Sequence, residues 1–243
     1  NVFDGIFFKH SENTNIQSLY SFIYKTIGFI TLKVSQYFPD IPVYFTLGNN
    51  DSYSGDYKIK ADGKFLHSTA DLFFKSFIKD KINNESFYST YPEGGYFSVV
   101  PPKINKARII SLNSIFFSTR YIVPSDSIEN HPASKQLQWF ENQLKQCMNN
   151  NERVWLLLHI PPGVGVYATL RTYGTEKSLQ NALLEWKSEY IEQFTNLVNN
   201  YSHIINAEFA GHIHMDDFRL VFSEKQSDKA SSFIHITPSI TPL

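Results

Sequence analysis

The sequence predicts an α/β fold in which a mixed β-sheet carries helices on its faces. Strand-like apolar runs alternate with helix-like segments along the chain, and neither an internal repeat nor a linker rich in Pro, Gly or Ser interrupts them. A chain of 243 residues is also long enough for one domain with a sizeable core. We therefore expect a single domain over residues 1–243.

The first half of the chain supplies a long helix, a strand and an insertion. Residues 15–38 have the apolar spacing of an amphipathic helix, and residues 43–47 form a β-rich run that ends at a glycine. Residues 52–95 are irregular and polar, with a helix near 69–80, and we expect this insertion to wall a cleft. Strands are expected near residues 96–100 and 107–112.

The second half continues the alternation. Ser134 is the expected cap of a helix over residues 135–149. Residues 154–158 are too apolar to be solvated on either face, which predicts a strand in a sheet that helices cover on both sides. Apolar spacing predicts another helix over residues 178–200. Further strands are expected over residues 203–210, 217–222 and 232–237.

Composition excludes several classes of protein. The formal net charge is −1, so the chain lacks the broad basic field that drives binding to nucleic acid, and we expect no specific nucleic-acid binding. Cys147 is the single cysteine, which excludes a disulfide within the chain. No apolar run reaches the roughly 18–20 residues that span a bilayer, and we expect any secretion leader to lie outside these residues. The oligomeric state stays open.

A pair of histidines follows the strand expected over residues 203–210. His212 and His214 stand two residues apart, and Gly211 before them is expected to turn the backbone so that both side chains reach one point. Imidazole is a ligand for zinc, iron, copper and nickel. Such a pair also occurs as ordinary histidines at a strand end, so its meaning depends on what converges with it.

Two other strands end in polar or imidazole side chains. The run over residues 43–47 leads into Gly48, Asn49, Asn50 and Asp51, which on their own are equally typical of a turn. His159 follows the apolar strand before it, where a core histidine is the alternative reading. Because ligands gather at the carboxyl ends of strands in open α/β sheets, the three strand ends together favour one shared site.

These motifs resemble those of the calcineurin-like metallophosphoesterase superfamily. Its last three motifs, Gly-Asn-(His/Asn)-(Asp/Glu), an isolated His and Gly-His-x-His, occur here in order. The chain is most similar to the branch of acid sphingomyelinase-like phosphodiesterases and endopolyphosphatases. That likeness is carried by residues 110–113, 136–140, 159–163, 211–218 and 237–239, and the variant with Asn50 is similar to the endopolyphosphatases.

The resemblance implies layered mixed β-sheets flanked by helices and a centre of two divalent metal ions, with zinc favoured over Mn, Fe and Co. It assigns Asn49, His159 and His212 to one ion and His214 to the other. Metal-bound imidazoles donate their second N–H to an oxygen, so Asp51 and Asp216 are expected to orient ligands. Asn50 lies beside them, where many relatives carry a proton-donating His.

The amino end departs from the family pattern. Residues 5–10 resemble the segment around the family's bridging Asp, but Ile6 stands in its place, and no Asp-x-His pair precedes it. An aliphatic side chain cannot offset the repulsion between two dications. Three explanations are open for the absence of these carboxylates. Residues near Asp4 are omitted from the sequence, the chain is a piece of a longer protein, or it is a degenerate relative. We favour omitted residues and expect the amino-terminal part of the domain to be missing.

The resemblance implies hydrolysis of phosphodiester or phosphoanhydride bonds by metal-activated water. An amide cannot act as a general acid, so His10 is the expected proton donor in place of Asn50, with a surface histidine as the alternative. Lys9, Arg171 and Tyr173 are candidates for binding substrate phosphate.

Polyphosphate, a nucleotide or a phospholipid headgroup is the expected substrate, with a slight preference for the first two. The competing hypotheses are a noncatalytic phosphoesterase-fold binding protein and a scaffold protein. By resemblance, the protein is expected to be secreted or in a vacuolar, endomembrane or periplasmic compartment.

Overall fold

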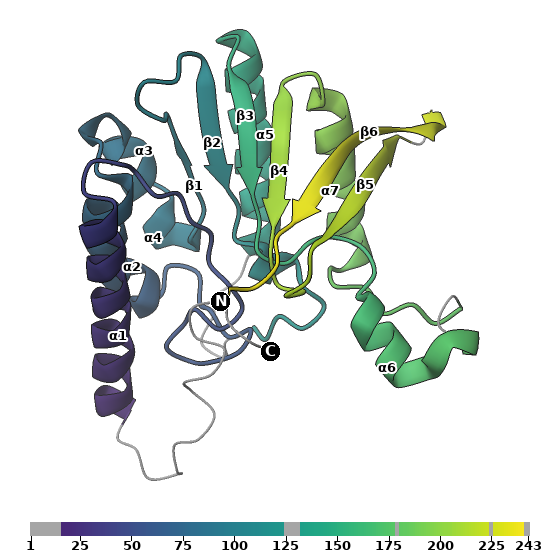
Figure 1. Cartoon of the computed structure of the whole chain (residues 1–243), viewed down its shortest axis with the longest axis horizontal. Helices are drawn as coiled ribbons and strands as arrows, with labels where there is room; N and C mark the ends of the chain where they lie inside the picture. Colours follow the sequence, from purple (N-terminus) through teal and green to yellow (C-terminus); the bar gives the residue numbers. More distant parts are fainter. Residues whose placement is uncertain (1–15, 124–131, 178–179, 224–225, 241–243) are drawn as a thin grey trace.

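The computed structural model describes residues 16–123, 132–177, 180–223 and 226–240, which form a mixed sheet with helices around it (Figure 1). The strands lie in the order β1-β2-β3-β4-β6-β5. Strands β2, β3, β4 and β6 run parallel, and β1 and β5 pair antiparallel at the two edges. The strands are β1 (Phe97–Val99), β2 (Ala107–Ser111), β3 (Arg153–Leu157), β4 (Ile205–Ala210), β5 (Asp217–Ser223) and β6 (Gln226–Ile236).

Two groups of helices surround this sheet. Helices α1 to α4 gather beside β1, whereas α5 and α7 cover one face of the sheet (Figure 1). The helices are α1 (Ile16–Tyr37), α2 (Lys64–Phe73), α3 (Asn84–Tyr88), α4 (Tyr91–Gly94), α5 (Pro132–Asn149), α6 (Val166–Lys177) and α7 (Ser188–Tyr201), with single turns η1 (Phe74–Ile78), η2 (Lys81–Asn83) and η3 (Ser114–Phe117). The α/β class, the first helix and the strand positions from residue 96 onward are confirmed. Within the described residues there is one sheet and not a stack of sheets.

The run over residues 43–47 forms no strand, contrary to the prediction. Its contacts with the end of β2 use side chains in place of a backbone ladder: the Ser111 hydroxyl donates to the Phe45 carbonyl at 2.8 Å and the Thr46 hydroxyl to the Leu112 carbonyl at 2.9 Å. The interpretation of residues 52–95 as irregular and polar is also wrong, because this segment buries an aromatic core. Its buried rings include Phe65, Phe73, Phe74, Phe77, Phe87 and Tyr91.

Strand β3 is buried on one face only, which corrects the prediction of burial on both. Val154 and Leu156 are fully buried under the helices, whereas Trp155 is 36% exposed. The strand register places further large apolar side chains on the same open face as Trp155, and all are at least 38% exposed: Phe209, Phe218, Leu220 and Phe233. The apolar run in the sequence therefore reflects two apolar faces, of which the described residues cover one.

Two helix boundaries differ from the predictions. Helix α5 begins at Pro132, so Ser134 lies inside it and does not cap it. Helix α7 begins at Ser188, and Leu184 and Trp186 belong to an extended segment whose bridges pair them with Val164 and Ser118. Apolar spacing alone did not distinguish this extended segment from a helix. Helix α6, which the sequence did not predict, occupies the chain between His159 and that segment.

Glu208 of β4 is buried under the helical face with 1% of its surface exposed, and the Ser232 hydroxyl donates to its carboxylate. Burial raises the pKa of this carboxyl to about 7 from the ordinary 4.5. Unfolding therefore releases a proton between these two pH values, so the stability from this group is complete below pH 4.5 and falls as pH rises through 7.

We predict that Glu208→Gln removes this pH dependence, which amounts to about 2.5 kcal/mol of unfolding free energy between pH 5 and 8. Urea unfolding of the wild type and the variant across that pH range measures the difference. Glu192→Gln on the exposed side of α7 is the control and keeps the wild-type slope. Parallel pH profiles for the wild type and Glu208→Gln would contradict the assignment.

Candidate metal site

Parallel pairing of β3 and β4 brings His159 and His212 together. Parallel strands end at the same edge of a sheet, the lower edge in Figure 1. The pairing continues past both strand ends, because the Leu158 N–H donates to the Phe209 carbonyl at 2.8 Å and the Gly211 N–H to the His159 carbonyl at 2.9 Å. The two imidazole rings consequently lie 5.1 Å apart, centroid to centroid, with 73° between their planes.

Asn49 reaches the same point from the extended segment beside β2. Its side-chain oxygen Oδ1 lies 2.9 Å from His159 Nε2 and 3.2 Å from His212 Nδ1, and those two nitrogens are 3.3 Å apart. Asn49 and His159 are buried, with 7% and 5% of their surfaces exposed. Three donor atoms from segments more than 50 residues apart thus form a small triangle.

The size of this triangle fits one metal ion. Ligands about 2.0–2.1 Å from zinc stand roughly 2.9–3.4 Å from each other in octahedral or tetrahedral coordination. All three measured separations, 2.9, 3.2 and 3.3 Å, fall in that range. Two imidazole nitrogens and an amide oxygen are also ordinary ligands for a divalent ion. The residues present therefore fit the ion that the sequence predicts.

The protonation of His159 suits this role. Burial, together with the neighbouring imidazoles of His212 and His214, holds the pKa of His159 well below its usual range. The ring is therefore neutral near pH 7 and keeps the lone pair that a metal ligand needs. The backbone also fixes its place, because Ser114 Oγ accepts the N–H groups of His159 at 3.2 Å and Ile160 at 2.8 Å.

Three further side chains contact these candidate ligands and a fourth contacts two of the three, and the sequence did not predict them. Asp56 Oδ1 accepts the Asn49 amide N–H at 2.7 Å. The Tyr57 hydroxyl lies 3.2 Å from His212 Nε2, and Glu185 Oε2 lies 3.7 Å from the same nitrogen. Arg120 contacts Asp56 and Tyr57. Only the nearness of Asp56 and Tyr57 to the Gly-Asn motif was a signal in the sequence.

The backbone strain in the His-x-His loop lies on the histidines themselves. His212 has a φ of +73° and His214 a φ of +64°, a region that residues other than glycine seldom adopt. Gly211 is not left-handed, so the prediction that Gly211 makes the turn is wrong. The turn is made at the two predicted ligands, a placement of strain that is common at binding sites.

The remaining predicted residues lie around this cluster or outside it. Asp51 Oδ2 accepts the Gly48 N–H at 2.7 Å and closes the turn that contains Asn49, so its role toward an imidazole stays a prediction. Asn50 is half-buried beside it, His214 is half-buried in the loop after His212, and Asp216 is exposed. Arg171 and Tyr173 are exposed on α6, outside the cluster (Figure 1). Residues 4–10, including Ile6, Lys9 and His10, lie outside the described residues.

Within the described ranges, no group of three or more His, Cys, Asp or Glu side chains is arranged to hold a metal. The cluster found here has two imidazoles and an amide as its third ligand. No helix among the same residues is long and apolar enough to cross a membrane.

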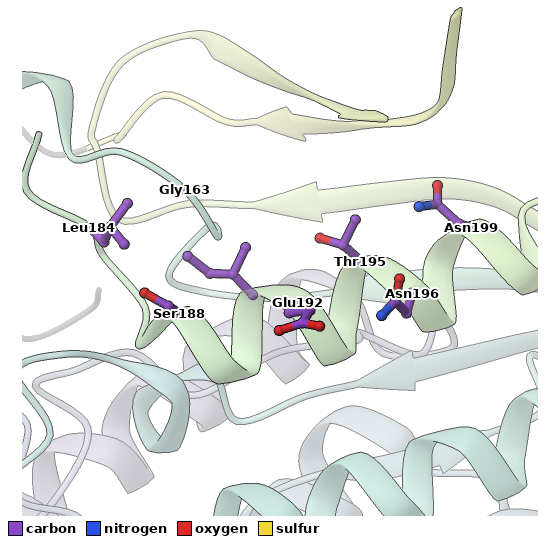
Figure 2. Close-up of a pocket in the computed structure, with 8 residues that line it drawn as sticks. Gly163, Leu184, Ser188, Glu192, Thr195, Asn196 and Asn199 are labelled. Carbon is purple, nitrogen blue, oxygen red and sulfur yellow. The ribbon is translucent and has the colours of Figure 1, made fainter. Parts of the chain in front are cut away.

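A separate hollow of about 370 Å³ runs along the outside of α7 (Figure 2). It is lined by Gly163, Leu184, Ser188, Ile191, Glu192, Thr195, Asn196 and Asn199. The lining includes none of the residues that converge at the ends of β3 and β4. The histidine cluster, and not this hollow, is therefore the candidate site.

An α/β sheet with metal ligands at the carboxyl ends of its parallel strands is an arrangement typical of metal-dependent enzymes. A sequence model described as calcineurin-like phosphoesterase matches residues 7–216. The chain belongs to this family of metallophosphoesterases.

Curated relatives agree with this assignment. The chain is 28% identical over 225 residues to the cyclic GMP-AMP phosphodiesterase SMPDL3A of Rattus norvegicus, with 91% of this chain and 44% of the relative covered. It is 28% identical to sphingomyelinase phosphodiesterase C of Dictyostelium discoideum, with 96% and 47% covered. Endopolyphosphatase of Schizosaccharomyces pombe is 24% identical, with 86% and 32% covered. The chain thus spans less than half the length of these relatives.

A dimetal phosphatase from Danio rerio superposes with a TM-score of 0.45 at 12% identity, covering 81% of this chain and 60% of that chain.

We predict that His212→Gly is more stable than His212→Ala by about 0.5–1 kcal/mol, although both variants lose the same ligand. Alanine keeps the strain of a left-handed backbone, roughly 1–2 kcal/mol, whereas glycine avoids this strain. Glycine also loses more conformational entropy on folding, which offsets part of that stabilisation. Thermal and urea unfolding of the two metal-free variants measures the difference. Equal stability would show that residue 212 is not held in this conformation.

Proposed function

We propose that this chain carries the metal site of a hydrolase that cleaves phosphodiester or phosphoanhydride bonds. The observation that supports the proposal is the triangle of Asn49 Oδ1, His159 Nε2 and His212 Nδ1, with separations of 2.9, 3.2 and 3.3 Å. Membership of the calcineurin-like phosphoesterase family supports the reaction class. Divalent ions in such a site polarise a phosphoryl group and supply a nucleophile from water at neutral pH.

The residues of this chain have distinct proposed roles around the centre. Asn49, His159 and His212 hold one ion, and His214 contributes to a second. Zinc is the metal we expect first, and Mn, Fe and Co are alternatives. Neutral imidazoles and a neutral amide do not themselves offset the charge of the ion, which attracts an anionic phosphate.

Proton transfer and substrate binding are assigned to other side chains. His10 is the proposed donor of a proton to the leaving group, because the Asn50 amide cannot supply one. Lys9, Arg171 and Tyr173 are proposed to contact substrate phosphate. The proposed location of the protein is secreted, vacuolar, endomembrane or periplasmic, in line with the resemblance of the sequence to its family.

The proposed substrate class is a phosphoanhydride, as in polyphosphate or the anhydride bonds of a nucleotide. Such substrates release a good leaving group, which depends less on a strong general acid than an alkoxide does. The presence of Asn50 beside the ligand Asn49 supports this choice. A phospholipid headgroup is the other substrate that relatives' names suggest, since one relative is named a sphingomyelinase phosphodiesterase.

We predict that the purified chain binds zinc and, as part of the whole protein, hydrolyses bis-p-nitrophenyl phosphate. His159→Ala and His212→Ala should each lower activity at least 100-fold and weaken zinc binding, because each removes a ligand from a three-ligand set. Elemental analysis and the colorimetric assay measure the two effects. His203→Ala, an exposed histidine before β4, is the control. Full activity in His212→Ala would exclude this site.

Substrate class needs a second experiment, in which the same enzyme receives polyphosphate, a nucleoside triphosphate and sphingomyelin vesicles. We predict faster turnover of the first two, and we predict that Asn50→His speeds the lipid reaction most, since the new imidazole supplies the missing acid. Released phosphate, nucleotide and phosphocholine are measured separately. A wild-type preference for sphingomyelin would contradict the proposed class. A noncatalytic protein of this fold would bind little metal and turn over none of the three.

A further inference from the structure

Arg120 lies beside the proposed metal site and contacts the supports of two different ligands. Its Nη2 donates to Asp56 Oδ2 at 3.2 Å, and its Nη1 donates to the Tyr57 hydroxyl at 3.3 Å. The guanidinium carbon also stands 4.3 Å from the centre of the Tyr57 ring, within the range of a cation–π interaction. One cation therefore fixes the positions of both an acidic and an aromatic neighbour.

The acidic contact determines which end of the Asn49 amide faces the histidines. Asp56 Oδ1 accepts the amide N–H of Asn49 at 2.7 Å, and this leaves Oδ1 of Asn49 directed at His159 and His212. A flipped amide would present an NH₂ group, which has no lone pair for a metal ion. Because Arg120 binds the other oxygen of the same carboxylate, it holds Asp56 in the rotamer that prevents the flip.

The aromatic contact determines the orientation of the His212 ring. The Tyr57 oxygen lies 3.2 Å from Nε2 of that ring, and the opposite nitrogen, Nδ1, faces Asn49 and His159. When Nδ1 is a ligand, Nε2 carries the hydrogen and donates it to an oxygen, as metal-bound imidazoles generally do. Tyr57 is 1% exposed and packs edge-on against His212, so its ring has little freedom once Arg120 covers its face.

We propose that Arg120 is a positioning residue for the metal site, acting through Asp56 on Asn49 and through Tyr57 on His212. The inference rests on the proposed function, because it concerns the ligands named there. It assigns to Arg120 no contact with the ion itself. It also differs from a direct role in binding substrate phosphate, which would leave the affinity for metal unchanged.

Exposure separates this role from an ordinary contribution to folding. The Arg120 side chain is 62% exposed and that of Asp56 is 30% exposed, so the ion pair is solvent-screened and adds little to stability. Loss of Arg120 should therefore affect ligand geometry more than the melting temperature. A second ion pair, between Arg108 and Glu152, serves as the control. Its side chains are 2.9 Å apart and only 12% and 13% exposed, and Arg108 lies at the amino end of β2, away from the candidate metal site.

The test compares Arg120→Ala with Arg108→Ala in the full chain. Zinc affinity is measured by competition with a chromophoric chelator, the geometry of the site by the absorption spectrum of bound Co²⁺, and stability by thermal unfolding. We expect Arg120→Ala to weaken zinc binding 10- to 100-fold and to change the Co²⁺ spectrum with little change in melting temperature. Arg108→Ala should lower the melting temperature and leave zinc affinity and the spectrum as in the wild type.

A second pair of variants tests the two arms of the contact. Asp56→Asn keeps an acceptor for Asn49 but loses the attraction to Arg120, and Tyr57→Phe keeps the ring but loses the oxygen near His212. Each should weaken zinc binding less than Arg120→Ala, because each affects one ligand. The double variant of Arg120→Ala with Asp56→Asn should lose less than the product of the single losses, since both changes act on Asn49.

Three outcomes would overturn the proposal. Unchanged zinc affinity in Arg120→Ala with a raised KM would make Arg120 a substrate-binding residue. An equal loss of zinc affinity in Arg108→Ala would show a general effect of destabilisation. Multiplicative losses in the double variant would show that Arg120 and Asp56 act independently. If His212→Ala binds zinc as tightly as the wild type, the proposed metal site itself is wrong, and that result is distinct from the other three.

Discussion

The parallel pairing of β3 with β4 is the constraint on which the rest of the site depends. Side chains alternate between the two faces of a strand, so a slip of one residue in this register would turn His159 or His212 away from its partner. Two hydrogen bonds past the strand ends, from Leu158 to Phe209 and from Gly211 to His159, extend the pairing to the histidines themselves. The helices that bury Val154 and Leu156 on one face hold that register in place.

Fixing the strands does not fix the side chains at their ends, and a second layer of polar contacts does so. A buried amide such as that of Asn49 costs free energy unless its groups are hydrogen-bonded, and Asp56 satisfies its N–H. His212 meets Tyr57 and Glu185 in the same way at its outer nitrogen. The ligands are therefore held ready for an ion by contacts that exist without it, which lowers the ordering that binding would otherwise require.

The convergence of Asn49, His159 and His212 was predictable from the sequence because each follows a recognisable strand or motif. His159 and His212 stand directly after apolar runs, and the topology of an α/β sheet brings such positions together. The supports were not predictable, because their contacts are distant in sequence: Arg120 is 63 residues from Tyr57, and Tyr57 is 155 residues from His212. Periodicity failed for a related reason at residues 183–187, where packing against Ser118 and Val164 holds an apolar segment extended in place of a helix.

The charges around the cluster indicate what an ion bound there would attract. The three converging donors are neutral, so these side chains would not offset the charge of a divalent cation bound between them. Asp56 is paired with Arg120, and Glu185 stands behind His212 at 3.7 Å, one imidazole away from the donor atoms. Coulomb attraction strengthens as the local dielectric falls, so the remaining positive charge would favour an anion that can approach closely. A phosphate group would be attracted to such an ion more strongly than a neutral ligand. The neutral donor set is therefore consistent with the phosphoester substrates of the family.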